Sequence, residues 1–448
     1  MASDSGLLAR LRAKLERHEF VKHVLTLLTG TASAQVLQIL ALIVVGRLYS
    51  ENQVAVWSMV MAAVMVISPV AAGRYDMAIV LPQHDNDARQ LLRLCTWINT
   101  VVCLLVVLGM FFLAPWAADL LTMNAKPSER PVLRAELMNW LYAVGPMAWL
   151  FTQLTTLSYW LTRTKNFRVV AENKIHQAVS VSGFQIGGGL AHIGVTGLVG
   201  GTVAGYLVSL VNLLRRTRGQ YRMDEGPVKT KGQLAHEFIK MPALNGPNAL
   251  VDAVRVNGIM FMIPAWFALA AAAHFSMAWR LLHAPMALIN AAVAQVFYQR
   301  LSTVKRGGML RIVRQAIVRS AVLGSIPFAL IWLLGPWALP FALGAKWAPA
   351  GEIARVLVPW LFLNFITSPI STVFVVVRRQ FTMLLFAIVY MAVPLTTIAL
   401  VHDDILQTLT LVSWGMFGAL VLFLGLALLV SWQYDRGFGE RVDEGADR

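Results

Sequence analysis

Four ionisable residues form two pairs inside long runs of apolar sequence. Asp252 and Arg255 are three residues apart, and so are Arg280 and His283. This spacing places both members of a pair on one face of an α-helix, where they can bind each other or a third group. Arginine binds anions through charge-assisted hydrogen bonds, whereas aspartate and histidine can exchange a proton. The two pairs therefore predict sites for an anionic ligand and for a coupling proton.

The depth of these residues in a membrane strengthens that interpretation. With a rise of about 1.5 Å per residue, Asp252 and Arg255 would lie about 15 to 20 Å inside, and Arg280 and His283 about 10 to 15 Å. A charge at the bilayer centre costs about 2.5 to 3.5 kcal/mol on insertion scales, so such groups should face a cavity or a partner. The alternative, that these charges only hold neighbouring helices together, stays open.

Five further residues lie nearer to the predicted cytoplasmic face. Glu172, Lys174 and His176 begin about 6 Å into their apolar run, so they either line a cavity or extend to the interface. Arg74 and Asp76 follow another run, where they either guard a cavity or anchor a helix end. We assign to substrate binding Arg280, Arg255, Arg74 and Lys174. We assign to coupling or ion pairs Asp252, His283, Asp76, Glu172 and His176.

The elements that must position these residues are membrane-spanning helices. The 448 residues are 57% hydrophobic and 14% charged, and their mean hydropathy is +0.63. Soluble domains are roughly 45–50% apolar and 25% charged. The apolar residues form runs long enough to cross a hydrocarbon core of about 30 Å as helices. The predicted spans are 24–45, 54–72, 94–115, 137–161, 169–192, 196–214, 243–269, 273–298, 321–343, 354–377, 381–401 and 405–432.

The distribution of basic residues predicts the orientation of these twelve spans. With both termini on the cytoplasmic side, 29 of the 38 Lys and Arg residues fall in inner segments and only 5 in outer ones. Such an excess is typical of cytoplasmic loops. We therefore expect a cytoplasmic amphipathic arm (1–23), a six-helix bundle (24–214), a cytoplasmic linker (215–242), a second six-helix bundle (243–432) and a cytoplasmic tail (433–448).

Weak internal repeats support two related bundles. The segment that starts at Gly30 resembles the one at Gly246, and Trp57-Ser-Met resembles Phe275-Ser-Met at similar offsets. Because each half holds an even number of spans, the repeats would be parallel, with a binding cavity between the halves. The fold class is thus an all-α polytopic membrane protein, and the arrangement favours transport.

Other classes of function lack their signatures. The net charge of +15 comes from residues spread over loops rather than from a basic stripe, so we expect no nucleic-acid partner. Cys95 and Cys103 are eight residues apart in one run and predict neither a disulfide nor a metal site. No phosphate-binding loop, nucleophile elbow or zinc motif is present, so we expect a transporter without a cofactor and not an enzyme.

Five stretches together resemble a known family. They are 73–82 (GRYDMAIVLP), 275–289 (FSMAWRLLHAPMALI), 293–301 (VAQVFYQRL), 344–351 (GAKWAPAG) and 358–370 (VPWLFLNFITSPI). This set resembles the polysaccharide and O-antigen flippases (Wzx-type) of the multidrug/oligosaccharidyl-lipid/polysaccharide exporter superfamily. The resemblance implies two bundles of six helices around a cationic cavity, with a lipid diphosphate-linked oligosaccharide as cargo. Arg74, Asp76 and Arg280 fall within these motifs, whereas Asp252, Arg255 and Lys174 rest on the depth argument.

The expected function is that of a flippase in a bacterial inner membrane. It would move an undecaprenyl diphosphate-linked oligosaccharide to the periplasmic leaflet by alternating access, for O-antigen, exopolysaccharide or capsule synthesis. The expected partners are this glycan lipid, membrane lipids and the polysaccharide polymerase and export machinery. Proton coupling, sodium coupling and uncoupled flipping all stay open. The alternative is a cation-coupled antiporter of drugs or small metabolites.

Overall fold

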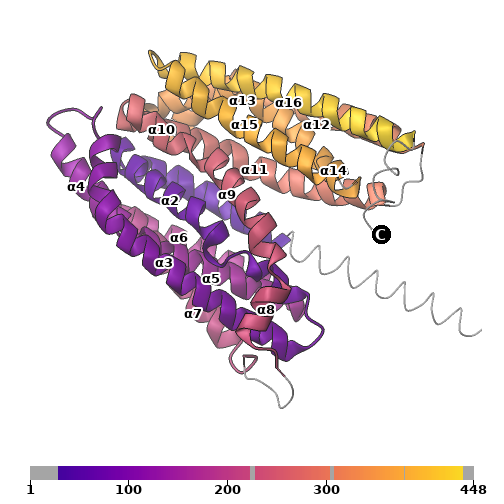
Figure 1. The fold of residues 1–448 in the computed structure, drawn as a ribbon. Coiled ribbons are helices and arrows are strands. Elements are labelled where there is room, and N and C mark those ends of the chain that lie inside the picture. Colours follow the sequence, from indigo (N-terminus) through magenta and orange to yellow (C-terminus); the bar gives the residue numbers. More distant parts are fainter. Residues whose placement is uncertain (1–28, 222–227, 303–306, 378, 437–448) are drawn as a thin grey trace, which may run out of the picture. The chain divides into compact units, whose positions relative to one another are not determined.

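The computed structural model describes residues 29–221, 228–302, 307–377 and 379–436. Within these ranges every regular element is a helix (Figure 1). The amphipathic arm predicted for residues 1–23 lies outside the described residues, as does most of the predicted tail.

Eight helical segments of the described chain are long and apolar enough to cross a membrane. They are Thr29–Leu48, α2 (Glu51–Ala71), α3 (Asp85–Leu121), α7 (Val195–Arg216), Met241–Trp266, α12 (Met309–Leu343), Ala345–Phe374 and α16 (Ile405–Asp435). Four more helices coincide with the remaining predicted spans, namely α5 (Val144–Arg163), α6 (Phe167–Leu190), α11 (Leu269–Ser302) and α15 (Gln380–Leu400). The chain is therefore an all-α polytopic membrane protein with about 12 transmembrane helices, as predicted.

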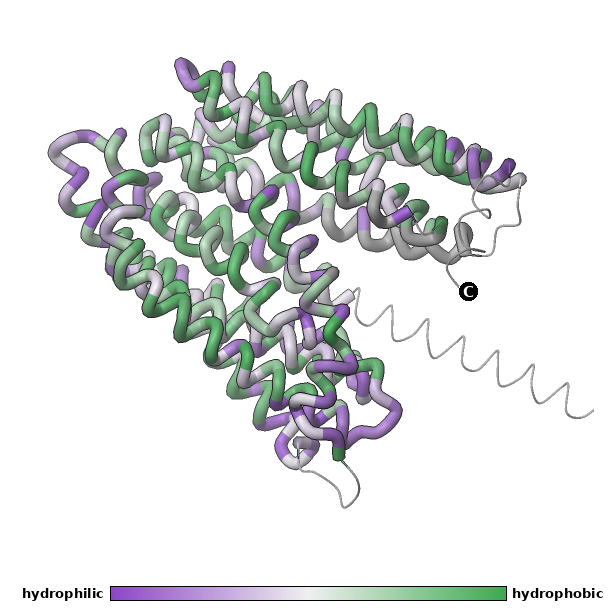
Figure 2. The backbone as a smooth tube through the Cα atoms, in the orientation of Figure 1, coloured by the Kyte–Doolittle hydropathy of each residue, from purple (hydrophilic) through white to green (hydrophobic). Residues whose placement is uncertain are grey.

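Apolar side chains on the outer helices are exposed in a way that only lipid can accommodate. In the most apolar 18-residue stretch of α3 and of α12, just 17% is buried inside the protein, against 72% in the corresponding stretch of α2. Leu105 and Phe112 of α3 and Ile326 of α12 are among the exposed side chains. Figure 2 shows hydrophobic residues along the long helices and hydrophilic residues gathered at helix ends and loops. These helices are thus solvated by hydrocarbon along much of their length.

The described chain divides into two compact units. The N-terminal unit contains residues up to 48, 67–111 and 142–247, and the C-terminal unit contains 49–66, 112–141 and 248 onward. The unit boundaries therefore fall within α2 and α3, because the first part of α2 and the last part of α3 belong to the C-terminal unit. The domain boundaries expected from the sequence stay a prediction.

Close helix packing organises the N-terminal unit. α6 and α7 pack against each other at Gly201 and Gly205, where a Cβ added to Gly205 would lie 2.4 Å from Val181 Cγ2. Small residues allow such close approach in a membrane, where dispersion contacts drive helix association. A short 3-10 helix, η1 (Tyr75–Val80), follows α2 and packs against α5. A short helix, α8 (Lys231–Glu237), begins with a capping box at Thr230.

A central helix organises the C-terminal unit. α13 (Ala348–Ile370) packs against α11, α12 and α16, and its Trp360 is almost fully buried. The predicted span 243–269 corresponds to the apolar helical segment Met241–Trp266. It consists of a π turn, η2 (Met241–Asn245), then α9 (Gly246–Asn257) and α10 (Ile259–Trp266). The smaller helices α4 (Arg130–Leu141) and α14 (Thr372–Val376) complete the unit.

Candidate substrate-binding and coupling sites

The segment Met241–Trp266 carries the first predicted pair. Its helices α9 and α10 meet at Gly258, whose backbone is itself helical. Arg255 Nη2 donates to Asp252 Oδ1 at 3.4 Å, so the spacing of three forms the expected pair. The Asp252 side chain is 55% exposed and that of Arg255 22%.

Arg255 begins a line of stacked aromatic side chains. Its guanidinium carbon lies 5.0 Å from the centre of the Tyr390 ring on α15. Tyr390 Oη accepts a hydrogen bond of 2.7 Å from Trp360 Nε1 on α13, and the Trp360 and Trp279 ring centres are 5.0 Å apart. Trp279 stacks in turn on His283 of α11 at 5.2 Å and 20°. We call these five residues the aromatic line.

The aromatic line joins two predicted residues that the sequence could not connect. Arg255 and His283 belong to different helices, and three aromatic residues that the sequence analysis did not single out bridge them. An arginine stacked on a ring keeps its charge and its in-plane donors for an anion. The arrangement can therefore hold an anionic group beside flat apolar surfaces.

Arg280 occupies a separate setting in the same unit. Its guanidinium carbon lies 4.0 Å from the centre of the Trp57 ring on α2, and its Nε donates to Ser276 Oγ at 3.3 Å. Ser276 Oγ and Ser58 Oγ share a hydrogen bond of 2.6 Å. These serines are equivalent positions of the predicted sequence repeat. The half-buried Arg280 is thus fixed by contacts on both α2 and α11.

The predicted residues on α6 have three different environments. Lys174 is half-buried, and its Nζ donates to Thr31 Oγ1 at 3.2 Å. Glu172 forms ion pairs with both Arg168 and Arg216, and His176 is exposed. Glu172 therefore serves a local ion-pair network at one end of α6 and α7.

Arg74 and Asp76 lie in the connection that contains η1. Asp76 is only 5% exposed, and its Oδ1 has no hydrogen-bond partner among the described residues. Arg74 Nη2 donates to Met77 Sδ at 2.9 Å and its Nη1 to the Pro69 carbonyl at 3.4 Å. Burial raises the pKa of the Asp76 carboxyl, while the Arg74 charge and backbone N–H groups act against that rise to a smaller extent. This carboxyl is therefore suited to hold a proton.

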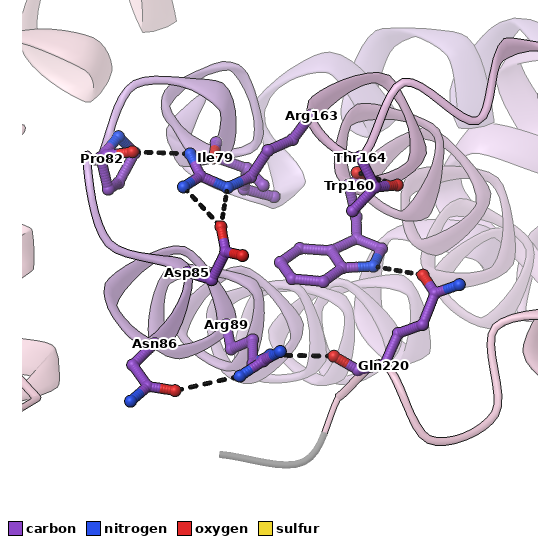
Figure 3. Close-up of polar contacts among 9 residues, drawn as sticks. All are labelled: Ile79, Pro82, Asp85, Asn86, Arg89, Trp160, Arg163, Thr164 and Gln220. Atoms are coloured by element: carbon purple, nitrogen blue, oxygen red, sulfur yellow. Dashed lines mark hydrogen bonds and ion pairs between the residues drawn. The ribbon is translucent and has the colours of Figure 1, made fainter. Parts of the chain in front are cut away.

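An arginine on α5 holds the far end of η1 in place. Arg163 Nη1 donates to the carbonyl oxygens of Ile79 at 3.3 Å and Pro82 at 2.7 Å (Figure 3). The same guanidinium pairs with Asp85 Oδ1, at 2.8 Å from Nη2 and 3.1 Å from Nε. Its side chain is 11% exposed. The backbone around Asp76 is thus fastened to both α3 and α5.

A second set of contacts in the same view fastens the residues after α7. Arg89 Nε donates to the Gln220 carbonyl at 2.9 Å, and Trp160 Nε1 donates to Gln220 Oε1 at 3.2 Å (Figure 3). These bonds connect α3 and α5 to the segment that follows α7.

Within each unit the predicted residues thus form two groups. In the C-terminal unit the aromatic line connects Asp252 and Arg255 with His283, while Arg280 is held by Trp57. In the N-terminal unit the groups are the η1 pair and the polar residues of α6. The sequence analysis missed Trp57, Trp279, Trp360 and Tyr390. A signal existed for Trp279, which stands one helical turn before His283.

Comparisons with solved structures identify the fold. An inward-facing multidrug resistance MATE family transporter of the MOP superfamily matches with a TM-score of 0.71 and 15% sequence identity. The match covers 90% of this chain and 96% of the transporter's chain. The lipid II flippase MurJ in an inward closed conformation matches with a TM-score of 0.71 and 13% sequence identity. That match covers 90% of this chain and 87% of the MurJ chain. The multidrug transporter DinF-BH in complex with R6G matches with a TM-score of 0.62, 14% identity, and coverages of 92% and 94%.

The chain therefore has the fold of the transporters of the MOP superfamily. No curated protein sequence matches it significantly. The sequence profile of the family described as "Polysaccharide biosynthesis protein" matches residues 44–352. The protein belongs to this family, which confirms the family predicted from the sequence motifs.

Proposed function

We propose that the protein moves a polyprenyl diphosphate-linked oligosaccharide from the cytoplasmic to the periplasmic leaflet of a bacterial inner membrane. Alternating access would expose the glycan lipid first to one side and then to the other. Membership of the polysaccharide biosynthesis family and the fold shared with a lipid II flippase support this substrate class. Such a protein would supply a polymerase and an export system that assemble surface polysaccharide.

The observation that carries the proposal is the pairing of arginine with aromatic rings inside the C-terminal unit. Arg255 lies against Tyr390 and Arg280 against Trp57, and both arginines are half-buried. A diphosphate offers acceptor oxygens for arginine donors, and sugar rings offer apolar faces that pack on aromatic side chains. The two features of this cargo thus correspond to the two kinds of side chain present.

The energetics explain why such a cargo needs a protein. A diphosphate and a chain of sugar hydroxyls would lose their hydration in hydrocarbon, which costs several kcal/mol per unsatisfied polar group and more for each charge. Lys174, a half-buried cation on α6 of the N-terminal unit, would add to the attraction for the cargo. Both termini of the chain would face the cytoplasm, as the excess of basic residues in inner loops indicates.

The first test is complementation in a strain that lacks the gene. The deletion should accumulate lipid-linked oligosaccharide, and the wild-type gene should remove it. Arg280→Ala should lower flux about 10- to 100-fold, because a hydrogen bond to a charged group contributes about 1.5 to 3 kcal/mol. Arg280→Lys should retain partial activity, since it keeps the charge but loses the planar donors.

A matched control separates this role from general stabilisation. Arg436 lies 4.2 Å from the centre of the Trp432 ring, so Arg436→Ala removes the same kind of contact at an exposed position near the end of α16. This variant should retain full activity. Full activity of Arg280→Ala, with normal protein abundance, would contradict the role of Arg280. A deletion strain that accumulates no lipid-linked oligosaccharide but retains more of a drug than the wild type would instead favour the antiporter.

A further inference from the structure

Asp76 is a buried acid that forms no ion pair with a described residue. It lies in η1, outside the membrane-spanning helices, and is 5% exposed. One of its carboxylate oxygens, Oδ1, has no hydrogen-bond partner among the described residues. An ionised carboxylate in such a place is strongly disfavoured, whereas the neutral acid is not. Its neighbour in the same unit, Asp87, is equally buried at 5% but accepts a hydrogen bond of 3.0 Å from the Lys229 backbone N–H.

The nearest cation does not neutralise Asp76. Arg74 is two residues away, yet its guanidinium donates to the Pro69 carbonyl and to the Met77 thioether, and its buried Nε has no partner in the described structure. Within the described residues no ion pair joins Arg74 to Asp76 at 4.0 Å or less. A thioether is a weak acceptor compared with a carboxylate. An arginine that prefers sulfur to a neighbouring carboxyl is expected when that carboxyl is uncharged.

The backbone just before Asp76 has an unusual conformation. Gly73 and Arg74 have φ values of 60° and 58°, so two successive residues adopt the left-handed conformation that an arginine rarely adopts. α2 ends just before them, at Ala71. A change at Asp76 that attracts Arg74 would therefore act on the turn that ends α2.

The other groups around Asp76 do not supply a compensating charge. From its own segment Tyr75 Oη donates to the Ala235 carbonyl at 3.1 Å, and from α3 Cys95 lies within electrostatic range. α5 contributes Tyr159, also within electrostatic range. α5 also contributes Arg163, whose guanidinium is occupied by backbone carbonyls and Asp85, and η2, which also packs on η1, carries no titratable residue. α8, whose Ala235 carbonyl accepts the Tyr75 hydrogen bond, carries Lys231, His236 and Glu237, and Glu237 pairs with Lys229.

We propose that Asp76 is a proton-binding site, that it is protonated in this conformation, and that loss of its proton draws Arg74 from Met77 and Pro69 onto the new carboxylate. The released proton passes to water at the end of the helix bundle, and one negative charge appears beside Arg74. The resulting ion pair changes the Gly73–Arg74 turn and thereby the end of α2. The raised pKa that burial gives Asp76 agrees with this assignment. That this proton drives transport is a further step, which rests on the proposed function.

Infrared difference spectroscopy of the purified full-length protein tests the site without any substrate. In the wild type, the carbonyl stretch of a protonated carboxylic acid should disappear as the pH is raised. It should disappear at a higher pH than that at which an exposed aspartate loses its proton. Asp76→Asn should remove that band. Asp87→Asn should retain it, because Asp87 is as buried but is hydrogen-bonded at the start of α3, where charge is favoured. No such band in the wild type, or the same band in Asp76→Asn, would overturn the proposal.

A transport measurement then tests the coupling. In proteoliposomes, a pH gradient should change the flipping rate of the wild type and of Asp87→Asn, and Asp76→Asn should lose that response. A response that persists in Asp76→Asn would overturn the coupling. A wild type that moves no lipid-linked oligosaccharide would contradict the proposed function, while the infrared band would still decide whether Asp76 holds a proton.

Discussion

At the scale of single residues, contacts between cations and aromatic rings fix the arginines. Trp57→Leu removes the ring 4.0 Å from Arg280. Because a desolvated cation–π contact contributes about 0.5 to 2 kcal/mol, the flux should fall about 2- to 30-fold. The flux of Trp57→Phe should fall less, since it keeps an aromatic ring. The control is Trp337→Leu, which changes an exposed tryptophan on α12. Equal flux in Trp57→Leu and the wild type, measured by accumulation of the lipid-linked substrate, would show that Arg280 needs no such support.

Asp76 should make the stability of the protein depend on pH. Burial raises the pKa of its carboxyl in the folded state above the unfolded value of about 3.9. The folded protein therefore binds the proton more tightly, so the free energy of unfolding falls as pH rises from the unfolded pKa through the folded one. Melting temperatures across this window should decline in the wild type and decline less in Asp76→Asn. A decline of equal size in both proteins would assign the effect to other groups.

Part of the candidate site could be predicted from residue types and spacing. The pair of Asp252 and Arg255 follows from helix geometry alone, which operates over three residues of one element. The rings that hold Arg255 and Arg280 come from α15 and α2. Such partners depend on which helices become neighbours, and the sequence of one helix does not encode that. For the same reason the ion pairs of Glu172 could not be distinguished from a cavity role.

At the scale of helices, two glycines set how closely α6 and α7 approach. A Cβ on Gly205 would lie 2.6 Å from the Val181 backbone nitrogen, where little adjustment is possible. Gly205→Ala should therefore destabilise the protein by about 1 to 3 kcal/mol through overpacking. Gly183→Ala on α6 is the control, since nothing lies within 4 Å of its added Cβ. Thermal unfolding in detergent should separate the two variants, and equal melting temperatures would contradict the packing argument.

A carboxylate joins the last helix of the C-terminal unit to the start of α12. Asp435 accepts hydrogen bonds from the backbone N–H groups of Gly307, Met309 and Leu310 at 3.0, 3.0 and 2.9 Å. The first N–H groups of a helix have no partner within the helix, and here Asp435 accepts from them. Asp435→Ala should therefore lower the free energy of unfolding by about 1 to 2 kcal/mol. The exposed Asp403 offers a control substitution to alanine. Unchanged thermal stability of Asp435→Ala would show that water replaces the cap.

At the scale of the whole molecule, hydropathy predicted the number of spans better than their ends. α3 runs over Asp85–Leu121 and α12 over Met309–Leu343, both longer than the apolar runs within them. Hydropathy detects only the part of a helix that contacts hydrocarbon, and helices continue beyond it wherever hydrogen bonds permit.

Transport of a lipid diphosphate-linked oligosaccharide is the central claim, and it can be measured with purified components. The protein would be reconstituted into liposomes that carry a fluorescently labelled polyprenyl diphosphate oligosaccharide in both leaflets, and a membrane-impermeant quencher would be added outside. Wild-type vesicles should lose nearly all of the fluorescence as inner-leaflet substrate reaches the outer leaflet, whereas protein-free vesicles should lose about half. Arg280→Ala vesicles should lose the inner-leaflet half about 10- to 100-fold more slowly than the wild type. Wild-type vesicles that retain the inner half of the signal would contradict the proposed function.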